Sequence, residues 1–141
     1  MFKNRKNNKK GFTLVEVIVV LVILAILAAI MIPALTGWID KANKKTAVVE
    51  ARTALLALQT EVAENYTPGS KSITITKDGE KLKVGDVDVT ADYNGLVGDD
   101  NAAKNTSGVD LDKTKVKTFK YVSSTGYEVT YAGGKFTVAD K

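Results

Sequence analysis

One carboxylate stands alone in the most apolar part of the sequence. Glu16 is the only charged residue between Phe12 and Leu35, and the 16 residues from 17 to 32 contain no polar side chain. A carboxylate on a membrane helix is costly, about 2.5–3.5 kcal/mol for Asp at the bilayer centre, and persists only with a role and a partner. The chemistry indicated for Glu16 is therefore pairing with a cation where the dielectric constant is low and the attraction strong.

The composition excludes several kinds of reactive site. The 141 residues include no cysteine and no histidine. This excludes disulfides, thiolate metal sites, a cysteine nucleophile and a Ser-His-Asp triad. The carboxylates lie mostly in predicted loops beside lysines, and no phosphate-binding glycine pattern is present. We therefore expect no enzymatic activity, no catalytic residue, no bound metal and no cofactor.

An acidic segment in the second half of the chain contains the residue types that bind calcium in proteins. Asp99, Asp100 and Asn101 are followed by Asp110 and Asp112. They do not form the Asp-x-Asn-x-Asp-Gly run of an EF-hand loop, so a solvated acidic loop is the preferred interpretation. The glycosylation sequons at residues 65–67 and 105–107 match a pattern that is common by chance.

The basic charge is concentrated at the N-terminus. The chain has 20 basic and 16 acidic residues, a net charge of +4, but residues 1–10 contain five basic residues and no acidic one. The remaining 15 basic and 16 acidic residues give −1, so no basic patch indicates nucleic-acid binding. A basic flank before an apolar run of nearly 20 residues predicts a membrane-spanning helix with its N-terminus in the cytoplasm.

Two ordinary interpretations of this region are open. A secretory signal peptide usually has a shorter apolar region, about 7–15 residues, and no acidic residue at its start. A plain signal anchor would let Glu16 reach the membrane interface beside a single transmembrane helix. A third interpretation depends on Glu16 and Gly11.

Residues 9–16, Lys-Lys-Gly-Phe-Thr-Leu-Val-Glu, closely resemble the leader and cleavage site of type IV prepilins and the related pseudopilins. The resemblance implies cleavage by prepilin peptidase between Gly11 and Phe12, followed by N-methylation of Phe12. A glycine also gives a peptidase access to the backbone, because it lacks Cβ. In the family, the glutamate at the position of Glu16 is thought to meet the N-terminal amine of a neighbouring subunit, which here would be Phe12, and so to set the register of the filament.

The resemblance implies a structural subunit of a type IV pilus, a helical surface filament for adhesion, motility or biofilm formation. Its partners would be identical subunits, prepilin peptidase, the pilus assembly machinery and, before assembly, membrane lipid. The precursor would cross the cytoplasmic membrane once, with its N-terminus inside, before becoming part of an extracellular filament. Two alternatives remain open: a pseudopilin of a type II secretion or DNA-uptake machine, and an anchored or secreted binding domain that never polymerises.

The elements that would position these residues begin with one long helix. The sequence predicts a helix from about residue 12 to 66, roughly 80 Å long at ~1.5 Å per residue. It continues through Pro33, where a kink is expected because proline cannot donate a hydrogen bond to Ala29. Beyond it, apolar residues recur every three or four positions and predict one buried stripe. The stripe comprises Val48, Ala51, Leu55, Leu58, Val62 and Tyr66, extended backwards by Leu35 and Trp38.

The C-terminal half has the alternation typical of strands. We expect strands at residues 72–76 and 81–84 around a turn at 77–80, a surface loop over 95–112, and an antiparallel meander at 117–123, 127–132 and 135–139. The fold class is therefore α+β, and a long helix laid on a small antiparallel sheet is also the pilin fold. The predicted organisation is a cleaved leader at 1–11, a membrane and filament-core segment at 12–35, an amphipathic helix at 36–66 and a β-rich domain at 67–141.

Overall fold

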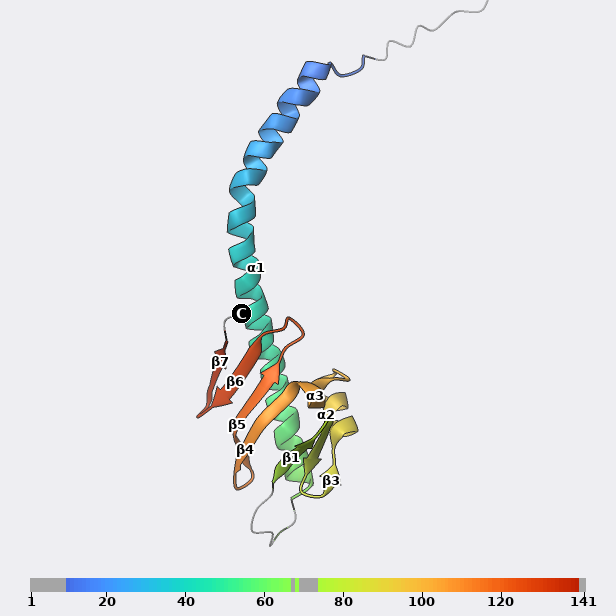
Figure 1. Cartoon of the computed structure of the whole chain (residues 1–141), viewed down its shortest axis with the longest axis vertical. Helices are drawn as coiled ribbons and strands as arrows, with labels where there is room; N and C mark the ends of the chain where they lie inside the picture. Colours follow the sequence, from blue (N-terminus) through green and yellow to red (C-terminus); the bar gives the residue numbers. More distant parts are fainter. Residues whose placement is uncertain (1–9, 67, 69–73, 140–141) are drawn as a thin grey trace, which may run out of the picture. The chain divides into compact units, whose positions relative to one another are not determined.

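A computed structural model of the chain describes residues 10–66, 68 and 74–139. The described residues form the predicted α+β fold, in which one long helix precedes two antiparallel sheets (Figure 1). The chain divides into two compact units, Met1–Ile39 and Asp40–Lys141, and helix α1 contributes residues to both. Most of the predicted leader, and the first two residues of the strand predicted at 72–76, lie outside the described residues.

Helix α1 is Leu14–Glu64, within two residues of the predicted bounds at each end. In the first unit, every residue of α1 is exposed. The helix continues through Pro33, as predicted, and the Thr36 hydroxyl donates a hydrogen bond of 2.9 Å to the Pro33 carbonyl oxygen. The kink at Pro33 stays a prediction.

In the second unit, α1 buries one face. The buried residues are mostly alanines and leucines, which pack into the core of the second unit. They are Ala47, Ala51, Ala54, Leu55, Ala57, Leu58, Glu61 and Val62. The stripe prediction is confirmed at Ala51, Leu55, Leu58 and Val62. It is wrong at its ends: Leu35, Trp38 and Tyr66 are exposed, since the first two precede the second unit and Tyr66 follows the end of α1.

Two sheets accompany α1 in the second unit. The first contains β1 (Ile75–Asp78), β2 (Lys81–Val84) and β3 (Val87–Asp88). The second has the order β4-β5-β6-β7, with β4 at Thr106–Asp112, β5 at Lys115–Val122, β6 at Glu128–Ala132 and β7 at Lys135–Val138. The predicted C-terminal meander is confirmed as β5–β7. Gly133 and Gly134 form its last turn with φ of 58° and 83°, a conformation that glycine adopts readily.

Two local predictions are wrong. Residues 95–112 are not a surface loop: they include the end of α2 (Thr90–Val97), all of α3 (Ala102–Asn105) and β4. Their polar side chains serve as internal partners, since the buried Thr106 hydroxyl donates a 2.8 Å hydrogen bond to the Ala102 carbonyl oxygen. Lys77 and Asp78 belong to β1 rather than to a turn, because they pair with Leu82 and Lys81 around the two-residue turn that follows them.

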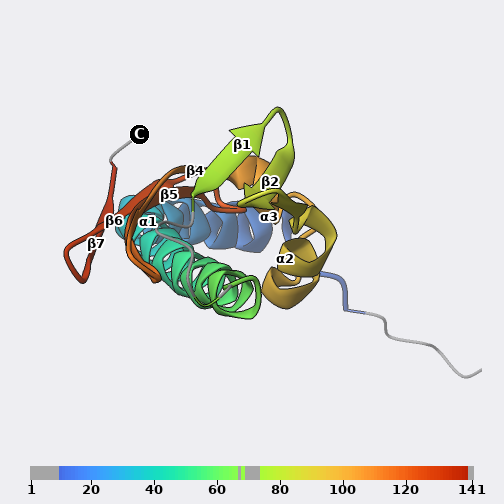
Figure 2. The ribbon, with the colours of Figure 1, turned by 90° about the horizontal axis from the view of Figure 1, so that it is seen from below.

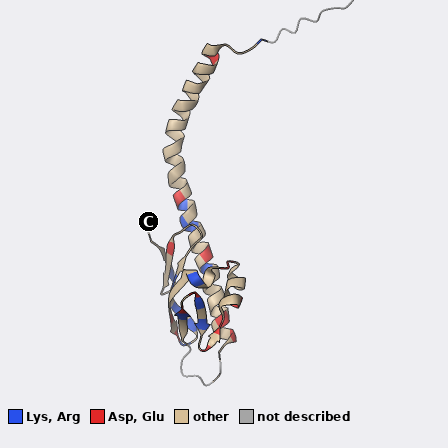
Figure 3. Cartoon of the chain, turned by 45° about the vertical axis from the view of Figure 1, so that its right-hand side comes forward, with Lys and Arg blue, Asp and Glu red and all other residues tan. Residues whose placement is uncertain are grey.

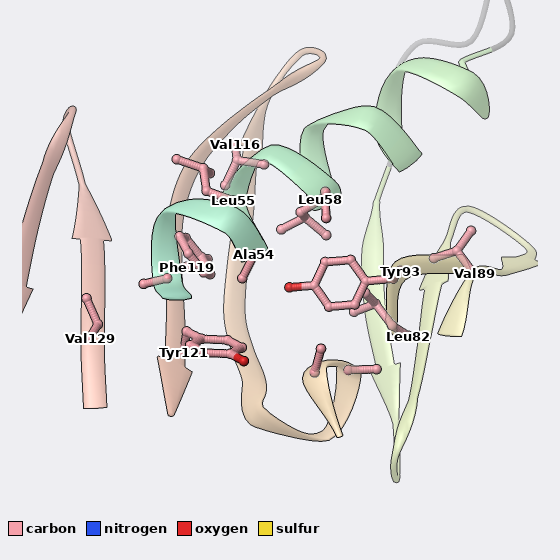
Figure 4. Close-up of a cluster of buried hydrophobic side chains, with 14 of the residues drawn as sticks. Ala54, Leu55, Leu58, Leu82, Val89, Tyr93, Val116, Phe119, Tyr121 and Val129 are labelled. Atoms are coloured by element: carbon pink, nitrogen blue, oxygen red, sulfur yellow. The ribbon is translucent and has the colours of Figure 1, made fainter. Parts of the chain in front are cut away.

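The core of the second unit lies between the buried face of α1 and side chains from β2, α2, β5 and β6 (Figure 4). Leu58 of α1 and Tyr93 of α2 are both fully buried, as is Phe119 of β5. The Tyr93 hydroxyl is 2.9 Å from Thr106 Oγ1, so its polar end is satisfied inside the core. Burial raises the pKa of Tyr93 to about 12.

Two carboxylates of α1 hold the connection between β5 and β6. Glu50 accepts a 2.7 Å hydrogen bond from the backbone N–H of Ser124, and Asp40 accepts one from the Tyr127 hydroxyl. Asp40 also pairs with Lys44, four residues later on the same helix, at 3.3 Å. In a chain without cysteine, these hydrogen bonds fasten the C-terminal sheet to the helix.

Candidate functional site

The first turn of α1 is built around Thr13 and Glu16. The Thr13 hydroxyl oxygen accepts a 3.2 Å hydrogen bond from the Glu16 backbone N–H, and Glu16 Oε2 accepts a 2.8 Å hydrogen bond from the Thr13 backbone N–H. The Thr13 hydroxyl also donates to Glu16 Oε2, at 3.1 Å. This reciprocal arrangement is a capping box, which satisfies backbone donors that the start of a helix otherwise leaves without partners.

The capping box fixes where α1 begins and where Glu16 lies. Threonine followed three residues later by glutamate, directly before an apolar run, is its sequence signature. The sequence analysis missed this local role of Glu16, although the spacing was available to find it. The carboxylate also lies in the first turn, where the positive end of the helix dipole favours a negative charge.

The predicted cleavage position lies just before this turn. Gly11 and Phe12 are outside the helix, and the Phe12 side chain is 89% exposed. A Cβ added to Gly11 would meet no atom within 4 Å. The structure therefore brings Gly11, Phe12 and Glu16 together within one exposed segment, whereas Pro33 lies farther along α1.

Beyond Glu16, α1 is uncharged as far as Ile39 (Figure 3). The large apolar residues of this stretch are all exposed; Ile18, for example, is 50% exposed and Ile30 70%. By length and composition, α1 can cross a membrane. A continuous apolar surface of this kind requires a lipid or protein partner.

The acidic segment has internal roles in the second unit. Asp99 accepts hydrogen bonds from the Asn101 backbone N–H at 2.9 Å and from the Tyr121 hydroxyl at 3.3 Å. Asp110 and Asp112 are residues of β4, opposite Thr118 and Lys115. Among the described residues, no group of three or more acidic side chains is placed to hold a metal ion.

The sequence analysis did not single out a second ionisable residue, Glu61, although it follows Leu58 of the predicted buried stripe by three positions. Its side chain is only 2% exposed, and its Oε1 atom has no hydrogen-bond partner. Burial raises its pKa, and the negative charges of Asp92 and Glu64 raise it further. This residue concerns stability and lies far along α1 from the exposed segment at Gly11.

Comparison with known protein families gives one finding, at the N-terminus. Residues 6–32 match the family described as the prokaryotic N-terminal methylation motif. The match includes Gly11, Phe12 and Glu16 and most of the uncharged stretch of α1. No curated protein and no solved structure matched the chain.

Proposed function

We propose that this chain is the precursor of a structural subunit of a type IV pilus. The premise is that the chain carries the N-terminal methylation motif, which is the hallmark of type IV pilins and pseudopilins. The observation that carries the proposal is the motif match over residues 6–32, which coincides with an exposed Gly11–Phe12 bond and a single carboxylate at the head of the uncharged stretch of α1. The subunit would act through assembly and not through catalysis.

The first proposed step is removal of the leader. Prepilin peptidase would cut between Gly11 and Phe12, and the new amine of Phe12 would be methylated. The accessible, Cβ-free position of Gly11 supports cleavage at this bond. The basic residues of the leader would hold the N-terminus in the cytoplasm until cleavage and would then be discarded.

The second proposed step is pairing of Glu16 with a neighbouring subunit. A methylated amine keeps its positive charge and two N–H donors. Both hydrogen bonds from Thr13 fall on Oε2 of Glu16, and a carboxylate has about four acceptor positions, so Glu16 can accept a further donor without losing its cap. The ammonium of Phe12 from an adjacent copy is a donor of the correct charge, and in an apolar surrounding the pairing would fix the axial register of the two copies.

The third proposed step transfers the apolar helix from lipid to other subunits. Residues 12–35 would span the cytoplasmic membrane in the precursor and form the filament core after assembly. The β-rich domain would form the filament exterior and supply adhesion, motility or biofilm contacts. The alternative, a pseudopilin of a type II secretion or DNA-uptake machine, shares the N-terminal motif and differs in where the assembled filament is found.

The test is to identify the N-terminus of the mature chain by mass spectrometry. We expect a chain that begins at Phe12 and carries the added mass of one methyl group. Gly11→Val should leave the precursor uncut, whereas Gly37→Val, at an equally open glycine within α1, should be processed normally. A mature chain that begins at any other residue contradicts the proposal, and electron microscopy with an antibody to residues 67–141 separates a surface filament from the pseudopilin alternative.

A further inference from the structure

The far end of the uncharged stretch of α1 has features that the proposed function leaves unused. Trp38 is 75% exposed and is the only tryptophan of the chain. Tryptophan is enriched where a membrane helix meets the membrane–water interface, because its ring is amphipathic. If Glu16 marks one interface, the uncharged residues 17–39 span about 34 Å at ~1.5 Å per residue, close to the ~30 Å hydrocarbon core of a bilayer. Trp38 and Ile39 then lie at the second interface.

Basic residues follow this end directly. Lys41, Lys44 and Lys45 occur within the first six residues after Ile39, and Arg52 follows seven residues later. Cytoplasmic flanks of membrane helices carry an excess of Lys and Arg, so basic residues are uncommon beside the translocated end. In the proposed precursor this is the translocated end. The basic residues therefore oppose the proposed topology, and a separate role for them is expected.

Two of these lysines have no anionic partner within the part of the chain that the structure describes. Lys41 and Lys45 are exposed, lie four residues apart on one face of α1 and form no ion pair there. Like charges at this spacing destabilise a helix. The carboxylate beside them in the sequence, Asp40, is already engaged, because it pairs with Lys44 at 3.3 Å and accepts a hydrogen bond from the Tyr127 hydroxyl. An external anion would relieve the repulsion between Lys41 and Lys45.

Lys45 also lines a shallow groove between α1 and β7, the edge strand of the second sheet (Figure 2). The groove has a volume of about 420 Å³ and includes apolar side chains of both elements, among them Val48 and Val138. Arg52 lines the same groove, and its Cζ atom lies 5.5 Å from the centroid of the Phe136 ring. A cation–π contact of this kind holds the guanidinium without an anion.

The distance along α1 separates these cations into two groups. At ~1.5 Å per residue, Lys41 and Lys45 follow Ile39 by about 3 and 9 Å, whereas Arg52 follows it by about 20 Å. The polar layer of a bilayer extends only about 5–8 Å beyond the hydrocarbon core on each side. A lysine gains reach because its flexible stem can bend toward the interface. The two exposed lysines can therefore meet lipid headgroups, and Arg52 lies beyond them.

We propose that Lys41 and Lys45 bind the phosphate of an anionic phospholipid of the phosphatidylglycerol type at the translocated side of the membrane. Such a lipid has a net negative charge, whereas the ammonium of phosphatidylcholine compensates its phosphate, so the two lysines select the anionic lipid. The inference rests on the proposed function, which places the precursor in the membrane, and it names a lipid partner for that stage. Because the lipid remains in the bilayer, the pairing is lost when α1 leaves the membrane.

The test uses Trp38 as the reporter in the full chain reconstituted into vesicles. The vesicles contain phosphatidylcholine with a minor share of phosphatidylglycerol, and one lipid at a time carries brominated acyl chains, which quench tryptophan emission on close contact. Trp38 lies at the opposite end of the uncharged stretch from Glu16, so quenching reports the lipids beside Lys41 and Lys45. We expect quenching by brominated phosphatidylglycerol to exceed its share of the lipid severalfold and to fall as the salt concentration rises.

Three single variants, each losing one positive charge at an exposed residue, locate the lipid site. Lys41→Gln and Lys45→Gln should each reduce the excess of phosphatidylglycerol severalfold, whereas Arg52→Gln, in the same groove as Lys45, should leave it unchanged. An equal loss in Arg52→Gln would assign the groove to a soluble anion and overturn the inference. Quenching in proportion to the lipid composition, or no quenching, also overturns it and leaves the proposed function intact. A mature chain that does not begin at Phe12 refutes the function instead.

Discussion

At the scale of single residues, Glu61 is a carboxylate that opposes the stability of its own domain. Its Oε1 atom has no partner, and its pKa in the folded chain lies above the ordinary value of 4.5 because of burial, Asp92 and Glu64. Between 4.5 and that raised pKa, the folded state binds more protons than the unfolded state. The free energy of unfolding therefore falls as pH rises through this interval, and the loss is complete above the raised pKa.

Replacing Glu61 with glutamine should remove this pH dependence. We expect Glu61→Gln to increase the free energy of unfolding near neutral pH by an amount on the order of 1 kcal/mol and to have a smaller effect near pH 4.5. The measurement is denaturant unfolding of the full chain in detergent across this pH range. Asp86→Asn, at an exposed carboxylate other than the two that raise the pKa of Glu61, is the control. If the free energy of unfolding changes with pH in the same way for the parent chain and for Glu61→Gln, Glu61 is not the cause of the pH dependence.

At the scale of elements, α1 contains two leucines of nearly adjacent position and opposite surroundings. Leu58 is fully buried in the core of the second unit, whereas Leu56 is 64% exposed on the other side of α1. Leu58→Ala should destabilise the second unit by about 2–5 kcal/mol, because it leaves a cavity between α1 and the core. Leu56→Ala should change stability by less than about 0.5 kcal/mol. Measuring the free energy of unfolding of both variants checks which face of α1 is buried. Equal losses of stability in the two variants would mean that the buried and exposed faces are misassigned.

The elements that could be predicted from the sequence are those with a clear period. The buried face of α1 repeats Ala51, Leu55, Leu58 and Val62 at helical spacing, and β5–β7 alternate apolar and polar residues between glycine-containing turns. These patterns reflect burial on one face, which residue type records directly.

The elements that could not be predicted are held by polar side chains that act internally. Residues 95–112 are rich in Asn, Asp, Thr and Gly, which favours a loop by composition. In the fold, however, Asp99 accepts a hydrogen bond from the Asn101 backbone N–H, and Thr106 contacts Tyr93 in the core. Such pairings depend on tertiary neighbours that no local pattern reveals. The capping box of Thr13 and Glu16 is different, because its signal is local and readable.

At the scale of the whole molecule, the proposed role of Glu16 in assembly can be separated from its role in the helix cap. Glu16→Ala should leave the proposed cleavage after Gly11 largely intact but abolish or greatly reduce the yield of sheared surface filaments, because the proposed pairing with the Phe12 amine would be lost. Thr13→Val removes the cap oxygen and retains the carboxylate, so it should reduce filament yield much less. Normal filaments from Glu16→Ala would exclude the carboxylate as the register device.

The hydrogen bonds that Glu50 and Asp40 make to the β5–β6 connection can form only late in the synthesis of the chain. Glu50 and Asp40 are synthesised 74 and 87 residues before their partners, Ser124 and Tyr127. Until β5 and β6 have emerged, the alanine-rich face of α1 lacks the part of its cover that these two strands supply. A chain that stops short of them therefore leaves apolar side chains of α1 in water that the complete chain buries.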